Sequence, residues 1–332
     1  MSFREEPCLV TGATGFVGSH LVDSLIQGGA SVSVLVRRNS NLQWLRDKPV
    51  QLLRGDILDA ITAEVTEVLK RSTYVFHAAG AIMALRREDY FKVNADGTRR
   101  LLAALRNANG PLKRFVLISS LAAAGPGTGD ALIGEDQEPH PVSWYGSSKL
   151  EAERIAHEYG PSVPFTIVRP PPVYGPRDYA LLPVFRLLKR GLTPVVGRGS
   201  QTNFVYITDL IEGILLAARS EQGRGEIFHI GALENCSATL VLNRIVAAIQ
   251  RKTITLPIPM PLVYLAALFS EIRMRMTGTP EILSFQKLAE LKQANWSMDI
   301  SKARRILHYD PRVSIEEGGR LTYEWYQRAG WL

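Results

Sequence analysis

Short apolar runs alternate with segments of helical periodicity through the first half of the chain. The apolar runs are rich in β-branched residues and end at glycine or polar residues, which is typical of buried strands. Three longer segments repeat apolar residues every three or four positions, which predicts helices over residues 19–29, 89–108 and 144–159. Strands that alternate with helices across short connections form parallel sheets covered on both faces. The predicted strands are residues 8–12, 30–36, 50–57, 73–80, 113–120 and 164–170.

The second half of the chain has a less regular pattern. Further strand-like runs occupy residues 203–207 and 225–231, and the remaining residues to the C-terminus have mostly helical patterns. We expect residues 225–231 to return to the sheet as a buried strand. The predicted fold class is therefore α/β: a Rossmann-like doubly wound parallel sheet with a smaller, discontinuous, mainly helical domain. We assign residues 1–176 to the sheet domain, with residues 203–232 returning to it, and residues 177–332 to the smaller domain.

Composition narrows the class of protein. The chain has 332 residues, of which 46% are apolar and 21% charged, as expected for an ordinary globular protein. The net charge is +7, but lysine and arginine are spread along the chain, so we expect a phosphorylated cofactor and no nucleic-acid partner. Two cysteines and six histidines lack metal-ligand spacing, and we predict no metal.

Membrane and targeting signals are weak. The N-terminal residues are acidic where a signal peptide would be apolar. The longest apolar stretch, residues 256–270, contains three prolines and is too short to span a bilayer. We therefore expect no integral membrane segment and a cytoplasmic location.

A glycine-rich turn, "TGATGFVGSH", joins the first strand to the first helix. Gly12 permits the tight turn, Gly15 leaves room for a pyrophosphate, and Gly18 lets the helix pack on the sheet. Free N–H groups at the helix start bind phosphates. This placement favours dinucleotide binding over a plain turn, and residues 1–176 are then the dinucleotide-binding domain. Contacts with the cofactor are predicted at Gly12, Thr14, Gly15, Phe16, Val17 and Gly18.

The end of the second strand bears on the choice of dinucleotide. An acid commonly holds the ribose 2′-hydroxyl of NAD, but Val36 stands there and Arg37 and Arg38 follow. Arginine suits a 2′-phosphate, so we predict NADP(H), with NAD as the alternative. Solvated arginines at a strand end are the structural alternative. Asp56, followed by Ile57, could accept from the adenine amino group or could serve a turn.

The segment "WYGSSK" places Tyr145 four residues before Lys149, on one face of a helix. A tyrosine has an ordinary pKa near 10, which is high for a base at neutral pH. A nearby ammonium and a positive nicotinamide would favour the phenolate and lower that pKa. We predict Tyr145 as the acid/base and Lys149 as its activator and ribose anchor. An ordinary surface pair is the alternative.

Several stretches resemble the extended short-chain dehydrogenases/reductases, also called the NAD-dependent epimerase/dehydratase family. They are "TGATGFVGSH", "GDILD", "HAAG", "VNADGT", "FVLISS", "YGSSK" and "RPPPVYGP", and they occur in the family's order. The resemblance implies that Ser120 hydrogen-bonds the reacting oxygen, with Ser119 as the fallback. It implies that Asn94 holds a water in a proton relay, whereas a structural role is the alternative for Asn94. His77 is interpreted as structural.

The resemblance also implies further cofactor contacts and an assembly. The small residues Ala78, Ala79 and Gly80 let the cofactor lie against the backbone. The segment from Pro170 to Val173 runs beside the nicotinamide carboxamide. The family commonly dimerises through its two long helices, so a homodimer is expected.

Three departures from the family pattern bear on the reaction. Thr202 and Asn203 stand where nucleotide-sugar enzymes carry a pyrophosphate-binding arginine. Lys292 is present where a second clamping arginine is expected. Leu121 and Ala122 replace the acid pair of sugar dehydratases, so elimination chemistry is unsupported.

An apolar segment, residues 257–278, resembles the part over the pocket in dihydroflavonol-reductase-like and 3β-hydroxysteroid-dehydrogenase-like members. A packed helix or a weakly amphipathic surface helix of the smaller domain is the structural alternative, and Glu271 in the run argues against a membrane-surface role. We therefore predict an NADP(H)-dependent carbonyl reductase or alcohol dehydrogenase for an apolar cyclic or long-chain small-molecule substrate, bound by the domain of residues 177–332. Trp144, Tyr179 and Phe204 are expected to line the pocket. The alternatives are a nucleotide-sugar 4-epimerase with tightly bound NAD and a non-catalytic dinucleotide-binding sensor.

Overall fold

A seven-stranded parallel sheet lies at the centre of the computed structural model, which describes residues 2–59, 61–196 and 200–332. The strand order is β11-β6-β5-β4-β1-β2-β3, and each neighbouring pair is parallel. The predicted fold class is confirmed, including the return of residues 225–231 to the sheet as its edge strand. The strands are β1 (Pro7–Thr11), β2 (Ser31–Val36), β3 (Val50–Arg54), β4 (Tyr74–His77), β5 (Arg114–Ile118), β6 (Phe165–Arg169) and β11 (Ile227–His229).

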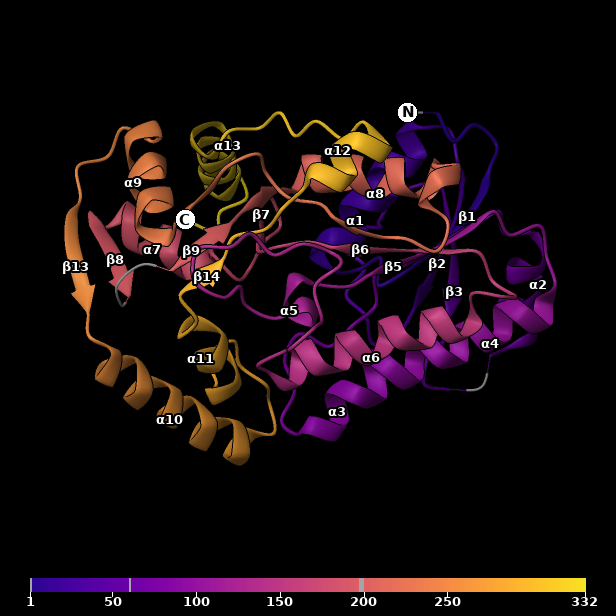
Figure 1. Ribbon diagram of the computed structural model, residues 1–332, viewed down its shortest axis with the longest axis horizontal. Helices are drawn as coiled ribbons and strands as arrows, with labels where there is room; N and C mark the ends of the chain where they lie inside the picture. Colours follow the sequence, from indigo (N-terminus) through magenta and orange to yellow (C-terminus); the bar gives the residue numbers. More distant parts are fainter. Residues whose placement is uncertain (1, 60, 197–199) are drawn as a thin grey trace.

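Helices cover both faces of this sheet (Figure 1). Alternation along the strands divides the core: Cys8 and Val10 join the cluster under one layer, and Leu9 joins the cluster under the other. The first layer contains α1 (Phe16–Gln27) and α8 (Ile207–Arg219). The second contains α2 (Ala63–Arg71), α4 (Gly97–Ala108) and α6 (Trp144–Tyr159).

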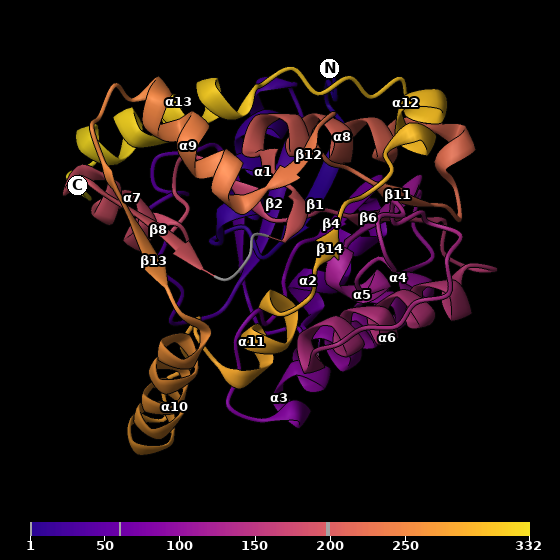
Figure 2. The same cartoon turned by 60° about the vertical axis from the view of Figure 1, so that its left-hand side comes forward.

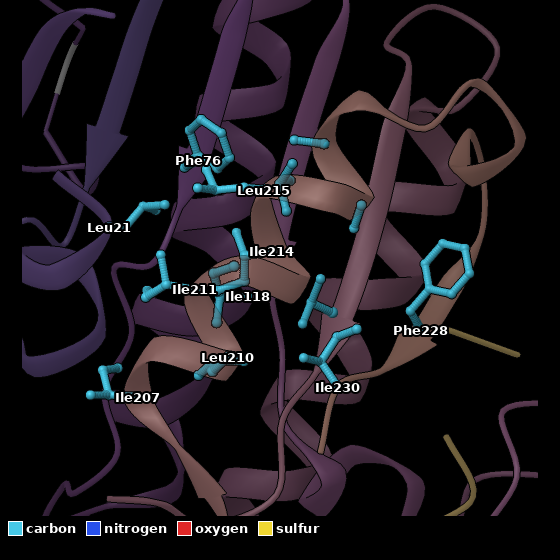
Figure 3. Close-up of a cluster of buried hydrophobic side chains, with 14 of the residues drawn as sticks. Leu21, Phe76, Ile118, Ile207, Leu210, Ile211, Ile214, Leu215, Phe228 and Ile230 are labelled. Atoms are coloured by element: carbon cyan, nitrogen blue, oxygen red, sulfur yellow. The ribbon is translucent and has the colours of Figure 1, made fainter. Parts of the chain in front are cut away.

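Helix α8 shows how the first layer is fixed. Its apolar side chains point at the sheet, where Phe76 and Ile118 lie beneath them (Figure 3). The sequence pattern predicted one strand over residues 203–207, and this is wrong. The structure has β9 (Gln201–Asn203), then β10 (Val205–Tyr206), and α8 begins at Ile207. No side chain caps the start of α8, so the sequence carried no local signal for it.

The predicted helix over residues 89–108 is three elements. Helix α3 (Arg87–Phe91) leads into a π-helical turn (Lys92–Asp96), and α4 follows. Such turns insert an extra residue and re-aim the side chains after them. Asn94 lies in this turn and is buried. A short helix that the pattern did not predict, α5 (Leu121–Ala124), follows β5.

Within the described residues, the remaining elements form a mainly helical region with three small sheets, one of which is the parallel pair of β7 and β10 (Figures 1 and 2). β8 pairs with β13, and β9 lies between β12 and β14. Helices α10 and α11 lie at the same end of the molecule as α3 and the start of α6 (Figure 1). None of the helices in the described ranges is long and apolar enough to cross a membrane. The elements are β7 (Val173–Tyr174), α7 (Leu182–Lys189), β8 (Leu192–Val196), β12 (Asn235–Ser237), α9 (Ala238–Ala248), β13 (Ile254–Ile258), α10 (Met260–Thr277), α11 (Phe285–Leu291), β14 (Asn295–Trp296), α12 (Ser301–Leu307) and α13 (Ile315–Arg328), with a 3-10 turn at Glu221–Gly223.

Candidate active site

Ser120 and Tyr145 meet where α5 touches the first turn of α6. Ser120 caps α5, accepting from the Ala122 N–H at 3.2 Å, and its side chain is hydrogen-bonded to Tyr145. The helices can approach because Gly146 has no side chain: a Cβ there would lie 2.3 Å from the Ala122 oxygen. Ser143 caps α6 by accepting from the Gly146 N–H at 3.0 Å. The sequence thus fixes the start of both helices and the contact between them.

Lys149 joins α6 to the carboxyl end of β5. Its ammonium donates to the Ile118 carbonyl at 2.6 Å, and the residue is 5% exposed. Burial lowers the pKa of Lys149 to about 8, and the Glu153 carboxylate opposes that shift. A Cβ on Gly80 would lie 3.8 Å from the Lys149 Nζ atom, so the loop after β4 also faces this ammonium. Lys149 is therefore held at the sheet edge where parallel-sheet ligands bind.

The pKa of Tyr145 differs from the prediction. Burial raises the pKa of Tyr145 to about 12, the Ser120 hydrogen bond lowers it, and the Glu290 carboxylate raises it further. The predicted lowering by Lys149 is not found in the protein chain itself. The Lys149 ammonium donates to the Ile118 carbonyl, and the prediction also depended on the positive charge of a bound nicotinamide. In the protein chain alone, burial therefore favours the neutral phenol, and the acid/base role of Tyr145 stays a prediction.

Asn94 fixes the loop beside this lysine. Its Nδ2 donates to the Ser148 hydroxyl at 2.8 Å and to the Ala81 carbonyl at 3.0 Å. Its Oδ1 accepts from the Ala81 N–H at 2.8 Å. All of these contacts are within the protein, so Asn94 supports the loop that follows Gly80. A role in a proton relay stays a prediction.

The two serines after β5 point to different partners. Ser119 donates to Glu153, whose carboxylate pairs with the Arg169 guanidinium in the interior. Ser120 reaches Tyr145 instead. The structure therefore supports Ser120, with Ser119 serving the buried ion pair. His77 is also structural: its ring nitrogens lie 2.7 and 3.0 Å from the hydroxyls of Thr11 and Thr98, and burial lowers its pKa to about 3.

The glycine-rich turn has the close approaches that a dinucleotide site requires. Gly12 has a φ of +72°, and a Cβ there would lie 2.5 Å from the Ala78 backbone. A Cβ on Gly18 would lie 2.2 Å from the Gly12 oxygen. Gly15 stands at the N-terminus of α1, with Thr14 beside it on the surface side of the turn. These are the approaches predicted from the sequence, and they fit a bound pyrophosphate.

The neighbouring predicted cofactor residues are placed as follows. Phe16 and Val17 pack partly against the core under α1 and α8. Ala78, Ala79 and Gly80 follow β4 directly, as the loop at its carboxyl end. Pro170 is buried after β6, and Val173 begins β7. All of these segments follow neighbouring strands of the sheet, so they share the edge that carries Lys149.

Three arginines gather at the end of β2. Arg37 and Arg38 are exposed, and Arg54 donates to their backbone carbonyls at 3.5 and 3.4 Å. Arg54 was not predicted as a site residue. It lies on β3, and the parallel β2–β3 pairing brings it to this edge. The position suits recognition of an anion next to the adenosine ribose.

Asp56 serves a turn. Its Oδ1 accepts from the Leu58 N–H at 3.0 Å, which is an Asx turn. Ile57 is 7% exposed and packs against Gly97, where a Cβ would lie 2.6 Å away. This turn uses one carboxylate oxygen of Asp56. A contact of the other oxygen with adenine stays a prediction.

The predicted pocket residues have different surroundings. Trp144 is 38% exposed beside Tyr145, at the start of α6. Tyr179 stacks on Trp331 with ring centroids 4.1 Å apart. Phe204 packs against two of the buried clusters. Of these three aromatic residues, Trp144 is the one next to the Ser120–Tyr145 pair, and pocket lining by the other two stays a prediction.

Helix α11 holds the start of the helix that carries Tyr145. Gln286 accepts from the Trp144 N–H at 2.7 Å, and Glu290 accepts from the Ser143 hydroxyl at 2.6 Å. Neither residue was predicted to belong to the site. They lie more than 140 positions away in the chain, and no local pattern distinguishes them from other surface residues of a helix.

The residues that depart from the nucleotide-sugar pattern make contacts within the protein. Asn203 is buried, accepts from the Ala232 N–H at 2.7 Å, and donates to the Asn235 side chain at 3.1 Å. Thr202 is buried and donates to the Asn203 carbonyl at 3.2 Å. Lys292 lies over the Tyr264 ring at 4.6 Å. Within the described ranges, no group of three His, Cys, Asp or Glu side chains could hold a metal ion.

The sheet, the glycine-rich turn and the Ser–Tyr–Lys arrangement define an NAD(P)-dependent enzyme of the extended short-chain dehydrogenase type. Residues 8–231 match the model of the NAD dependent epimerase/dehydratase family, and the chain belongs to that family.

Relatives within this family act on different substrates. The chain is 30% identical to a ceramide reductase from Caulobacter vibrioides, over 97% of this chain and 95% of the relative. It is 25% identical to a decarboxylating sterol-4-alpha-carboxylate 3-dehydrogenase from Mus musculus, over 97% of this chain and 91% of that one. Among solved structures, UDP-glucuronic acid 4-epimerase from Bacillus cereus, in complex with UDP-glucuronic acid and NAD, is 26% identical with a TM-score of 0.76, covering 97% and 99% of the two chains.

Proposed function

We propose that this protein is an NADP(H)-dependent carbonyl reductase or alcohol dehydrogenase for an apolar cyclic or long-chain hydroxy or keto substrate. In this proposal Tyr145 is the acid/base, and Ser120 donates to the reacting oxygen of the substrate. Lys149 holds the cofactor ribose and, with it, favours the phenolate. Asn94 keeps the loop after Gly80 in place beside Lys149. The nicotinamide cofactor supplies or accepts the hydride when bound.

One observation supports the proposed substrate class. Thr202 and Asn203 occupy the position of a pyrophosphate-binding arginine, and both are buried in contacts within the protein. A nucleotide-sugar pyrophosphate that lacks bidentate arginine partners binds poorly. The similarity to a ceramide reductase and to a sterol dehydrogenase supports the same conclusion.

The preference for NADP(H) rests on charge at the end of β2. Arg37 and Arg38 are exposed directly after β2, and Arg54 donates to their backbone carbonyls, so this end of the strand is rich in positive charge that would suit a ribose 2′-phosphate. Val36, which cannot accept a hydrogen bond from a ribose hydroxyl through its side chain, stands before them. A homodimer through α4 and α6 and a cytoplasmic location complete the proposal, as expectations from the family resemblance.

A nucleotide-sugar 4-epimerase with tightly bound NAD is the second candidate. The similarity in fold and sequence to UDP-glucuronic acid 4-epimerase favours it. An epimerase would use the same Tyr145 and Lys149. A non-catalytic sensor is disfavoured, because the Ser120, Tyr145 and Lys149 arrangement is kept with its supporting contacts.

The test combines native mass spectrometry with an activity panel. We expect the purified protein to exchange its cofactor freely and to oxidise NADPH with steroid, flavonoid or long-chain 3-keto compounds. Tightly held NAD together with interconversion of UDP-sugars would support the epimerase instead. No turnover of either set, with NADPH bound, would support the sensor.

A further inference from the structure

Helix α10 carries apolar residues on two opposite faces. Its inner face, which includes Val263 and Ala267, is buried in a cluster with Leu288 of α11. Successive residues of an α-helix are 100° apart, so Leu265, Phe269 and Ile272 fall together on the opposite side. These outward side chains are exposed, and Phe269 has 63% of its surface open. The outward apolar face consists of Leu262, Leu265, Leu268, Phe269, Ile272 and Met276.

The charges of α10 are arranged around this face. Glu271, the single acid in the helix, is turned towards α11 and accepts from the Phe285 N–H at 3.3 Å. Arg273 and Arg275 are exposed and lie at the two edges of the outward apolar face. Arg273 pairs with Glu281, whose second contact is the Ser270 hydroxyl at 2.7 Å. The outward apolar face therefore has a cationic border and no acidic residue on it.

The strand before α10 also carries exposed apolar residues and is preceded by basic residues. Ile254 and Leu256 of β13 are 74% and 42% exposed, and Arg251 and Lys252 directly precede them. No acidic residue occurs from residue 251 to residue 270. Helix α10 projects from the body of the molecule, so this surface is convex (Figure 2).

We propose that the outward apolar face of α10 docks onto the surface of an anionic lipid bilayer. The helix would lie in the plane of the interface, with its apolar side chains among the acyl chains. Arg275 would extend to lipid phosphates at one edge, while Arg273 at the other edge stays paired with Glu281. Arg251 and Lys252, which precede β13, would add to the attraction of an anionic surface. An exposed apolar surface of this extent requires such a partner.

Charge complementarity selects the bilayer over a second copy of the chain. Two copies facing each other would bring their basic borders together, and the nearby acids Glu271 and Glu281 are already engaged within each copy. Anionic headgroups neutralise the border instead. This proposal goes beyond the proposed function, and vesicle binding is measured without turnover.

The test is co-sedimentation of the full chain with vesicles of phosphatidylcholine, alone or mixed with phosphatidylglycerol. We expect binding to the mixed vesicles that weakens in high salt. The double variant Phe269→Glu/Ile272→Glu should lower the partition coefficient roughly 100-fold or more, because two buried apolar side chains are lost. The variant Arg251→Gln/Arg275→Gln should lower it roughly tenfold and reduce the effect of phosphatidylglycerol.

The matched control is Leu132→Glu/Leu233→Glu, which makes the same charge change at two apolar residues that are 48% and 56% exposed elsewhere. It should bind vesicles as the wild type does, and circular dichroism should show each variant folded. Wild-type protein that stays in the supernatant with mixed vesicles would overturn the proposal. An equal loss in the matched control would also overturn it. A dimer that Phe269→Glu/Ile272→Glu dissociates, without vesicle binding by the wild type, would assign the face to a second copy.

Discussion

The Glu153 carboxylate pairs with the Arg169 guanidinium in the interior, at 2.6 Å between Oε2 and Nη2, and both side chains are at most 2% exposed. Glu153 lies one helical turn after Lys149 and also accepts from Ser119. The pair therefore joins α6, the end of β6 and the residue after β5, all beside the proposed reacting groups.

Removing one partner of this pair should destabilise the protein. Glu153→Leu leaves the Arg169 guanidinium buried without its carboxylate, which costs about 3–5 kcal/mol. Urea unfolding should show this loss in the free energy of unfolding. Glu158 lies on the same helix as Glu153 and pairs at the surface with Arg99 of α4. Glu158→Leu breaks this exposed pair and should change the free energy of unfolding by at most ~1 kcal/mol. Equal effects of the two substitutions would contradict the account of the interior pair.

Replacing the phenol of Tyr145 should stop the chemistry and leave binding intact. Tyr145→Phe removes the proton that the substrate oxygen needs, so kcat should fall by about 10²–10⁴-fold while the Kd for NADPH stays the same. Tyr159→Phe, at the other end of α6, is the control and should keep full activity. Intact turnover in Tyr145→Phe would remove Tyr145 from the mechanism.

The raised pKa of Tyr145 predicts opposite pH dependence for the two directions. Reduction needs the protonated phenol, which is present below its pKa, so its rate should stay high through neutral pH. Oxidation needs the phenolate, so its rate should rise with pH up to that pKa. Glu290→Gln removes a negative charge that raises the pKa of Tyr145, and the alkaline limb of kcat should move to lower pH. An alkaline limb that stays in place or moves to higher pH would contradict this effect of Glu290 on the pKa of Tyr145.

The arginines at the end of β2 should set the cofactor preference. Arg37→Ala/Arg38→Ala should lower kcat/KM for NADPH by about 10–100-fold, because two charge-assisted contacts with the 2′-phosphate are lost. The value for NADH should stay nearly the same. Arg224→Ala, an exposed arginine elsewhere, controls for net charge. Equal losses with both cofactors would indicate that these arginines do not read the 2′-phosphate.

The close approach at Gly18 should be required for cofactor binding. Gly18→Ala places a methyl group 2.2 Å from the Gly12 oxygen, so the turn must move. NADPH affinity by titration calorimetry should fall about 10–100-fold, the effect of overpacking a tight contact. Gly134→Ala meets nothing within 4 Å and should bind as the wild type does.

Features of the site that depend on local spacing could be predicted from the sequence. Tyr145 and Lys149 share a helix face, and Gly12 and Gly18 are close across one turn, so neighbouring residues determine both relationships. The π-helical turn at Asn94 could not be predicted, because the apolar period continues through it. Ser120 was preferred to Ser119 from the sequence, but the separate role of Ser119 could not be predicted, because it depends on the position of Glu153.

Contacts between distant segments were outside the reach of the sequence pattern. The pKa of Tyr145 in the protein chain alone could not be read from the sequence, because its burial and the approach of Glu290 both depend on the folded structure. The lowering predicted with a bound nicotinamide stays a prediction. A surface helix was one of the alternatives for residues 257–278, but the sequence could not show which of the apolar residues of α10 pack on α11 and which are exposed.

The anchoring of Trp144 by Gln286 and of Ser143 by Glu290 has a consequence for biogenesis. A nascent chain carries every residue proposed for proton transfer once the ribosome has passed residue 149, yet α11 is made only after residue 285. The first turn of α6 thus acquires its anchors only after α11 has been made. Incomplete chains released before that point would lack the contacts that hold Tyr145 in place. The sheet can therefore form earlier than the complete site.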